Sequence, residues 1–353
     1  MKSPLLQLCL CTLLGLLGLG CNKTDSPAKN PDTGTEGWKI LNSTPQSNER
    51  FDDIFFINEF SGWICSDAGE VYHTSDGGNS WTFLAKKDSI WFRCIGFANA
   101  QKGWIGNLNH GNNLPGKALF ETTDSGLTWS NISGRIQGVP VPALCGIWVV
   151  NENTVFALGR WSGPAVFVKT LDSGTTWIST DMSSLASGLV DAYFFNENEG
   201  FVVGTKGDVS DGTSQSIILF TDDAGQTWQS KYLGDHIGEF CWKIQFVGRD
   251  VGYVSTEGAN AEGAIIKTID GGQSWTRIKI GDKVQLEGIG FISPDRGWVG
   301  CSPTGDIYST SDGGQSWRKF NLGKGINRMR VINSKLIFAS GGDLGAQVYK
   351  WTP

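Results

Sequence analysis

Short apolar runs alternate with clusters of glycine and polar residues from residue 37 to the end of the chain. Each unit begins with an apolar run, such as residues 54–57, and a second run opens with glycine and an aromatic residue, such as Gly62 and Trp63. A third run, such as residues 264–268, leads into a polar turn, and a fourth starts at a tryptophan. Runs of this length between turn residues predict β-strands. We therefore expect an all-β protein built from repeated four-stranded units.

The polar turn follows the pattern Thr-x-Asp-x-Gly-x-(Thr/Ser)-Trp and occurs six times. Aspartate and threonine side chains can bond nearby backbone amides, and glycine supplies the positive φ that a tight turn needs. The tryptophan that follows buries a large ring at the start of the next strand. Since a catalytic group is not needed six times, we interpret the turn aspartates as residues of the fold: Asp76, Asp124, Asp172, Asp223, Asp270 and Asp312.

This turn resembles the Asp-box (BNR) hairpin of sialidases and related β-propellers. In that family the box is structural, joins the third and fourth strands of a blade, and lies on the side away from the ligand. The box tryptophans of this chain recur every 42 to 51 residues, which is the period of a four-stranded propeller blade. The resemblance and the period together predict a β-propeller.

The ends of the repeat region determine the number of blades. After the last box, residues 329–332, 336–339 and 347–351 predict three more strands, and a fourth is missing there. At the other end, residues 37–41 look like a strand that follows a box but have no strands before them. Because ring closure removes both free sheet edges, we predict seven antiparallel four-stranded blades, the last completed by the N-terminal strand. The alternative is six blades with a loose tail.

The first 36 residues have a different composition. Residues 1–20 combine Lys2 with a short apolar run, which is typical of an export signal and not of a membrane span. Small residues before Cys21 resemble a bacterial lipobox, with Cys21 as the lipidated residue; the alternative is an ordinary secretory signal. Residues 21–36 are then a flexible tether and residues 37–353 the propeller. We expect a lipoprotein of the cell envelope, in the outer membrane.

The net charge of the protein narrows the classes of partner that we expect it to bind. The formal charge is −6, which gives no electrostatic reason to expect nucleic acid or an anionic membrane surface as partner. The lipid is therefore the only membrane contact that we predict, and we expect a monomer.

Five cysteines remain after the signal and Cys21 are set aside, and the strand pattern puts them at the strand ends opposite the boxes: Cys65, Cys94, Cys145, Cys241 and Cys301. These cysteines could form a soft-metal site with loop histidines such as His110 and His236. However, Cys-x-x-Cys and closely spaced histidines are absent from the sequence. We predict neither a metal nor a cofactor. A bridge from Cys94 to Cys65 or Cys145 stays open, and the odd number leaves at least one thiol unpaired.

Ligand sites of propellers usually lie around the axis, on the face opposite the boxes. On that face the longest predicted loops, such as residues 106–116 and 204–216, belong to blades 2–5, and long loops are often functional. Residues just before the first strands should surround the axis. With His110 they form the predicted binding site: Asp52, Asp53, Trp91, Arg93, His110, Asp191, Trp242, Lys243, Glu287, Arg328 and Arg330. Mixed charge with two tryptophans suits a protein segment or a glycan; the alternative is a solvated rim with internal ion pairs.

The repeat length, the glycine–aromatic second strands, the boxes and the shared last blade resemble the photosystem II stability/assembly factor family of exported seven-bladed propellers. The resemblance covers Gly37 to Pro353. It implies a non-catalytic scaffold that binds an envelope protein during assembly of a membrane complex. Photosynthetic members use an arginine-rich patch, whereas the arginines here alternate with acidic residues, so only the scaffold class is carried over.

A glycan-binding or sialidase-like hydrolytic propeller is the alternative function. The Arg-Ile-Pro signature of sialidases is absent near the N-terminus. Paired carboxylates, such as Asp53 with Asp191 or Glu287, keep glycoside hydrolysis open as a hypothesis.

Overall fold

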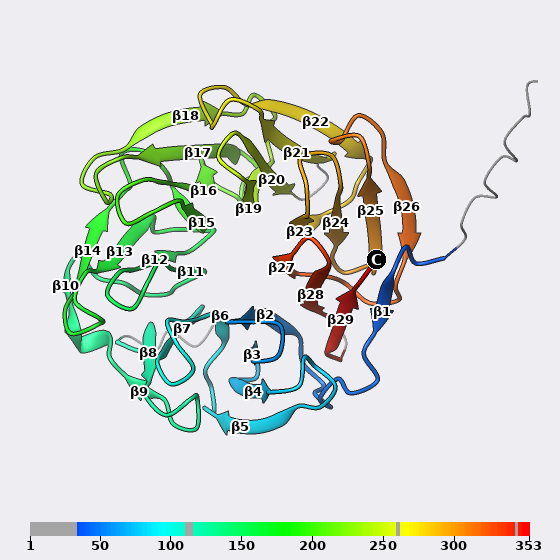
Figure 1. The fold of residues 1–353 in the computed structure, drawn as a ribbon. Helices are drawn as coiled ribbons and strands as arrows, with labels where there is room; N and C mark the ends of the chain where they lie inside the picture. Colours follow the sequence, from blue (N-terminus) through cyan, green and yellow to red (C-terminus); the bar gives the residue numbers. More distant parts are fainter. Residues whose placement is uncertain (1–33, 110–115, 259–261, 343–344) are drawn as a thin grey trace, which may run out of the picture. The chain divides into compact units, whose positions relative to one another are not determined.

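Seven sheets surround a central axis in the computed structural model, which describes residues 34–109, 116–258, 262–342 and 345–353 (Figure 1). Within these residues, strands form nearly all the regular structure, beside one short 3-10 helix, η1 (Ser133–Arg135). Thr35–Pro353 is one compact unit. Cys21 and His110 lie outside the described residues. None of the helices in the described part has the length and apolarity needed to cross a bilayer.

Each blade has four antiparallel strands, named here from the axis outwards. The innermost strands are β2 (Phe51–Phe56), β6 (Phe92–Phe97), β11 (Gly146–Val149), β15 (Gly188–Phe194), β19 (Phe240–Val247), β23 (Leu286–Phe291) and β27 (Arg328–Asn333). The second strands are β3 (Gly62–Ser66), β7 (Gly103–Asn107), β12 (Val155–Gly159), β16 (Gly200–Lys206), β20 (Val251–Glu257), β24 (Gly297–Cys301) and β28 (Leu336–Gly341). The third strands are β4 (Glu70–Thr74), β8 (Leu119–Thr122), β13 (Val166–Thr170), β17 (Gln215–Thr221), β21 (Gly263–Thr268), β25 (Asp306–Thr310) and β29 (Gln347–Trp351). The outermost strands are β5 (Thr82–Lys86), β9 (Ser130–Asn131), β14 (Trp177–Asp181), β18 (Gln229–Leu233), β22 (Thr276–Gly281), β26 (Arg318–Asn321) and β1 (Trp38–Ile40).

The N-terminal strand closes the ring. β1 pairs antiparallel with β29, and Trp38 lies opposite Trp351. The Trp38 ring is buried and meets Trp298 of the sixth blade edge-on, with ring centroids 6.0 Å apart. The prediction of seven blades with a shared last blade is therefore confirmed, and the alternative of six blades with a loose tail is wrong.

The glycine–aromatic pairs of the second strands have a packing reason. In each case a phenylalanine at the end of the first strand covers the glycine of the second. A Cβ on Gly62 would lie 2.6 Å from the Phe56 ring, and one on Gly103 equally close to Phe97. Only glycine therefore fits at the start of the second strand, because the phenylalanine ring at the end of the first strand occupies the space of a side chain there.

The six Asp-box turns lie between third and fourth strands and share one hydrogen-bond pattern. In the first, Thr74 Oγ1 donates to Asp76 Oδ1 (2.8 Å) and accepts from the Gly78 amide (2.9 Å). The Asp76 carboxylate also accepts from the Ser80 amide (2.9 Å) and hydroxyl (2.6 Å). The same bonds recur around Asp124, Asp172, Asp223, Asp270 and Asp312. These bonds to the ionised form lower the pKa of each of the six carboxyls.

Lysines join the turns to neighbouring blades. Lys169 Nζ donates to the Ala224 carbonyl (2.8 Å), Lys267 Nζ to that of Gly313 (2.7 Å), and Lys350 Nζ to that of Gly77 (3.1 Å). Each acceptor is the fourth residue of a box and has positive φ. The box therefore holds its own hairpin and also anchors the preceding blade.

One element was not predicted. Residues 136–138 form β10 (Ile136–Gly138), which pairs in parallel with the outer strand β14 and widens the third sheet to five strands. Ser179 Oγ supports it by donating to the Gln137 (3.0 Å) and Val139 (2.6 Å) carbonyls. The sequence predicts only a long connection between blades here, and it gives no clear signal of an additional strand.

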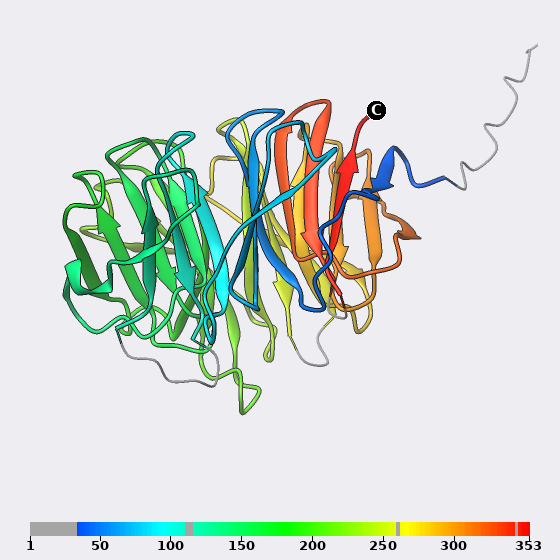
Figure 2. The ribbon, with the colours of Figure 1, turned by 90° about the horizontal axis from the view of Figure 1, so that it is seen from below.

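The two faces of the ring differ, as the side view shows (Figure 2). Connections from the first to the second strand and from the third to the fourth lie on one face, which we call the box face. Connections from the second to the third strand and from one blade to the next lie on the other, the long-loop face. The loop between β16 and β17 extends farthest on that side.

Candidate binding site on the propeller axis

Bulges occur near the starts of five innermost strands, and in all of these except β15 a polar residue lies in the bulge. In β2, Phe51 and Asp53 pair with adjacent residues of β3, so Asp52 is the extra residue. Arg93 and Glu287 are the extra residues of β6 and β23 in the same way. A bulge bends the strand and re-aims a side chain. Sequence periodicity cannot show this, because one inserted residue shifts the alternation without changing composition.

The structure places most of the predicted site residues inside the inner strands. The sequence predicted that these residues precede the innermost strands, and of the described ones only Trp91 does so. His110 lies outside the described residues. They are also buried and not part of a solvated rim, although Trp91 and Arg330 are only partly buried. The buried residues are Asp52, Asp53, Arg93, Asp191, Trp242, Lys243, Glu287 and Arg328. Charged groups tolerate such burial only when they are paired.

The first ion-pair group centres on Asp52. Its Oδ1 lies 2.7 Å from Arg50 Nη2 and 3.4 Å from Arg93 Nη1, and its Oδ2 accepts from the Trp91 indole N–H. The Arg93 guanidinium also stacks over the Trp242 ring, 5.2 Å from its centroid. Burial opposes the charge of Arg93, but its negatively charged neighbours, Asp52 first among them, together raise the pKa of that guanidinium.

The second group links blades across the axis. Arg328 Nη1 donates to Asp191 Oδ2 at 2.8 Å, and its Nε lies 3.4 Å from Asp53 Oδ1. The Asp53 carboxylate also accepts from the Ile95 amide of the next blade (3.0 Å). Burial opposes ionisation of Asp191, but Arg328 and Lys243 lower the pKa of that carboxyl. Blades 1, 2, 4 and 7 are therefore joined through buried charges.

A third group contains a carboxyl that the sequence analysis missed. Trp242 Nε1 donates to Glu287 Oε2 at 3.2 Å. Burial, and next the charge of Glu287, raise the pKa of Glu257 to about 8. Glu257 ends β20 two residues after Ser255, which bonds the Glu287 carbonyl at 3.1 Å. Residues two apart on a strand lie on the same face of the sheet. The spacing of Ser255 and Glu257 could therefore have indicated that Glu257 lies near Glu287.

An aromatic cluster covers the axis at the long-loop face. We call it the axial aromatic cluster: Trp91, Leu108, Cys145, Trp161, Val190, Val209, Phe240 and Trp242. Its members come from blades 2–5, the sector with the long loops. Trp161 stacks on Phe240, with centroids 6.0 Å apart, and remains partly exposed, as does Trp91. Nearby in the chain, Ile237 is 63% exposed in the loop before β19. Trp91 and Trp242 belong to the binding site predicted from the sequence, whereas Trp161 does not.

The five described cysteines are buried free thiols. The bridges from Cys94 to Cys65 or Cys145, left open by the sequence, are therefore not formed. Burial raises the pKa of the Cys65 and Cys94 thiols, which suits small apolar core residues. Among the residues that the structure describes, histidines, cysteines and carboxylates form no group that could hold a metal ion.

Glycoside hydrolysis by Asp53 and Asp191 does not suit this arrangement. Both carboxylates form ion pairs with the same guanidinium, that of Arg328. A hydrolytic pair needs one carboxyl that holds a proton at working pH. Because Arg328 lowers the pKa of the Asp191 carboxyl, Asp191 is not placed to serve as the acid.

The fold and the axial site together define a seven-bladed propeller whose axis holds buried ion pairs and, at the long-loop face, an aromatic cluster. The chain is 29% identical over 314 residues to the photosystem II assembly lipoprotein Ycf48 of Nostoc sp., which covers 68% of this chain and 88% of that protein. It is 22% identical over 250 residues to the photosystem II stability/assembly factor HCF136 of Oryza sativa subsp. japonica, over 62% of this chain and 58% of that one. The predicted resemblance is therefore confirmed, as homology to the Ycf48 and HCF136 assembly factors. No protein-family model matches the chain.

Solved structures agree on the fold. YCF48 bound to a D1 peptide superposes with a TM-score of 0.65 at 17% identity, over 90% of this chain and 97% of that one. A GH74 xyloglucanase from Xanthomonas campestris reaches 0.66 at 13% identity, over 88% of this chain and 53% of that enzyme. A binding protein and a glycoside hydrolase thus share the architecture, so the fold alone does not assign function.

Proposed function

We propose that the protein is an exported, non-catalytic propeller that binds a protein partner through the axial aromatic cluster and assists assembly of a membrane complex. The observation that carries this proposal is the partly exposed cluster over blades 2–5, at the face with the long loops. Large rings that are apolar yet partly exposed are typical anchors of protein interfaces. The buried charges beneath hold the inner strands in place and do not touch the partner.

Two relatives support the choice of a protein partner over a glycan. Ycf48 of Nostoc sp. is an assembly lipoprotein, and YCF48 has been solved with a D1 peptide bound. The identity to the solved protein is low, so the partner of this chain is proposed as a class, a protein segment of a membrane complex under assembly. The protein acts as a monomer without a cofactor.

The proposed anchor is a lipid on Cys21. In this proposal residues 1–20 are removed as a signal, residues 21–36 form the tether, and the propeller of residues 37–353 stands off the envelope membrane. Replacing Cys21 with Ser should move the protein from the membrane fraction to the soluble fraction. Equal membrane association of both forms would contradict the lipid anchor.

The partner test compares capture from detergent-solubilised envelope by the wild type and by the double variant Trp161→Ala, Ile237→Ser. We expect a membrane protein to be captured by the wild type and reduced at least about tenfold with the variant. The matched control is Leu171→Ala, Ile269→Ser, which changes two exposed apolar residues of the box face. Equal capture by all three proteins would exclude the aromatic cluster as the partner site.

A further inference from the structure

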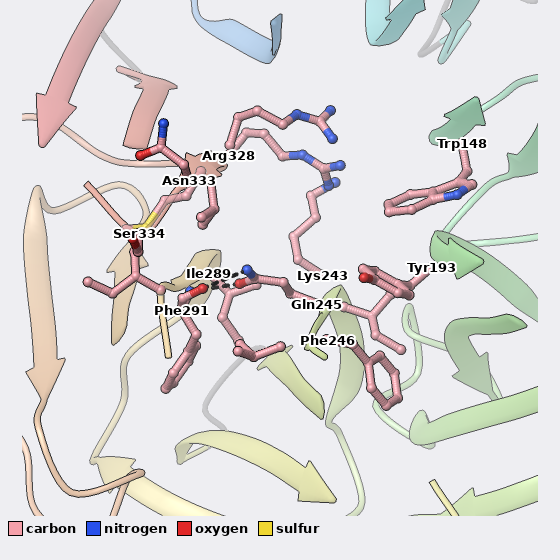
Figure 3. A pocket seen from close by; sticks show the side chains of 16 residues that line it. Trp148, Tyr193, Lys243, Gln245, Phe246, Ile289, Phe291, Arg328, Asn333 and Ser334 are labelled. Atoms are coloured by element: carbon pink, nitrogen blue, oxygen red, sulfur yellow. Dashed lines mark hydrogen bonds between the residues drawn. The ribbon is translucent and has the colours of Figure 1, made fainter. Parts of the chain in front are cut away.

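A hollow of about 390 Å³ lies on the axis at the box face, away from the aromatic cluster. We call it the axial pocket. Ends of the innermost strands of blades 3–7 line it, and it reaches the surface at Asn333 and Ser334, in the turn after β27 (Figure 3). Pockets of this size hold small organic molecules.

Three cations line the deep part of the axial pocket: Lys243, Arg328 and Arg330. Figure 3 shows Lys243 running towards the Arg328 guanidinium, with Trp148 and Tyr193 on the other side of the hollow. Arg328 uses Nη1 on Asp191, and Arg330 donates its Nε to the Ile54 carbonyl at 3.3 Å. Arg328 Nε and Arg330 Nη2 face Asp53 Oδ1, at 3.4 and 3.9 Å. Among the described residues, this leaves Nη2 of Arg328 and Nη1 of Arg330 as the donors that can face a ligand.

Positive charge exceeds negative charge at this place. The carboxylates that contact these three cations belong to Asp53 and Asp191, and none of the described lining residues of the pocket is acidic. Within the described chain, the Lys243 ammonium has no hydrogen-bond acceptor and lies 5.7 Å from the Trp242 ring centroid. Burial, together with the charge of Arg328, lowers the pKa of Arg330 to about 10. One bound negative charge would balance the group.

The outer walls are largely apolar. Trp148 and Tyr193 pack with ring centroids 4.7 Å apart, and Ile289 and Phe291 lie opposite on β23. The Gln245 side-chain amide is held by the Phe291 backbone: its oxygen accepts from the Phe291 amide at 2.7 Å, and its nitrogen donates to the Phe291 carbonyl at 2.9 Å. A ligand therefore needs an anionic end for the deep cations and an apolar body for the walls.

From this geometry we infer that the axial pocket binds a small monocarboxylate with an aromatic or aliphatic body. Planar carboxylates match guanidinium groups, which donate two parallel hydrogen bonds. The single unbalanced positive charge favours one carboxylate over a multiply charged phosphate or sulfate. The axial pocket is separate from the proposed partner surface, so a test of one proposal does not decide the other.

The test titrates the folded protein with benzoate and hexanoate, and with benzamide and hexanamide as neutral analogues of the same shape. Intrinsic tryptophan fluorescence reports binding near Trp148, and calorimetry checks stoichiometry. We expect both carboxylates to bind at one site per chain and both amides to bind at least about tenfold more weakly, since each charge-assisted hydrogen bond is worth more than a neutral one.

Variants locate the site. Lys243→Met and Arg330→Gln should each weaken benzoate binding at least about tenfold. Lys335→Gln removes an exposed cation just outside the pocket on the same face and should leave binding within twofold. Circular dichroism and thermal melts verify folding, and Arg330→Gln, which changes a less completely buried side chain, serves if Lys243→Met does not fold.

Several outcomes would overturn the inference. Equal affinity for acids and amides would show that the charges take no part. Phosphate or sulfate binding as tightly as benzoate would make the pocket a general anion site. Loss of binding in Lys335→Gln equal to that in Arg330→Gln would place the ligand on the surface, and the absence of binding by both carboxylates would remove the site.

Discussion

At the scale of single residues, the axis is a place where burial and charge oppose each other. Arg328 lies beside Asp191 and lowers the pKa of that carboxyl, whereas Glu257 forms no ion pair with the described residues and its pKa is raised by burial and by the charge of Glu287. Two buried carboxyls of one region thus have pKa values shifted in opposite directions by their neighbours. Position in the sequence does not reveal this difference.

Glu257→Gln should make the protein more stable in alkaline solution. The folded pKa of about 8 lies above the ordinary value of 4.5, so the folded protein retains a proton that the unfolded chain loses. Stability contributed by the protonated group is present below about pH 4.5 and falls as pH rises to about 8. The variant, which cannot ionise, should gain about 1–3 kcal/mol relative to wild type at pH 8.

Urea unfolding at pH 5 and pH 8 measures this gain, with the exposed Glu49→Gln as control for the same chemical change. An equal difference between variant and wild type at both pH values would show that Glu257 is not protonated in the folded protein.

At the scale of elements, the Asp-box is the unit that the sequence specifies most fully. Its residues bond within eight positions of one another, so the motif alone predicts the turn. The bulges of the inner strands and the added strand β10 depend on partners far along the chain, such as Ser179 for β10. Local pattern could therefore predict blades and turns, but not burial of the charged residues that the bulges carry to the axis.

Asp223→Ala should lower the melting temperature of the protein at neutral pH by about 2–4 °C, because four hydrogen bonds end on this carboxylate. The folded pKa of about 2 lies below the ordinary 3.8. The stabilisation is present above about pH 4 and disappears as pH falls towards 2. Calorimetry between pH 2 and pH 7 should show the variant converging on wild type at the acidic end.

Asp222→Ala is the matched control, since it removes the exposed neighbouring carboxylate in the same turn. If both variants melt alike across the pH range, the hydrogen bonds to Asp223 do not account for the stability of the turn.

At the scale of the whole molecule, ring closure depends on a three-residue strand. Trp38 is 1% exposed and packs against Trp298 and Trp351, so its side chain secures blade 7 to blade 6. Trp38→Ala should cost about 3–5 kcal/mol of unfolding free energy, the usual range for a buried tryptophan. Ile40→Ala, on the same strand but 47% exposed, should cost far less.

Denaturant unfolding measures both changes. A cost for Trp38→Ala no larger than that for Ile40→Ala would mean that the first strand does not secure the ring.

The pairing of β1 with β29 also has a consequence for synthesis. The first strand to leave the ribosome must wait for the C-terminal strand, because Trp38 and Trp351 are more than 300 residues apart. Until then blade 7 lacks its outermost strand, and the unpaired edge of β29 is open to proteases and to other chains. A chain that lacks its last few residues would lose β29. Its β1 would then have no partner strand, the ring would stay open, and the chain would be degraded more readily. The pairing of β1 with β29 can therefore form only when the whole propeller has been synthesised.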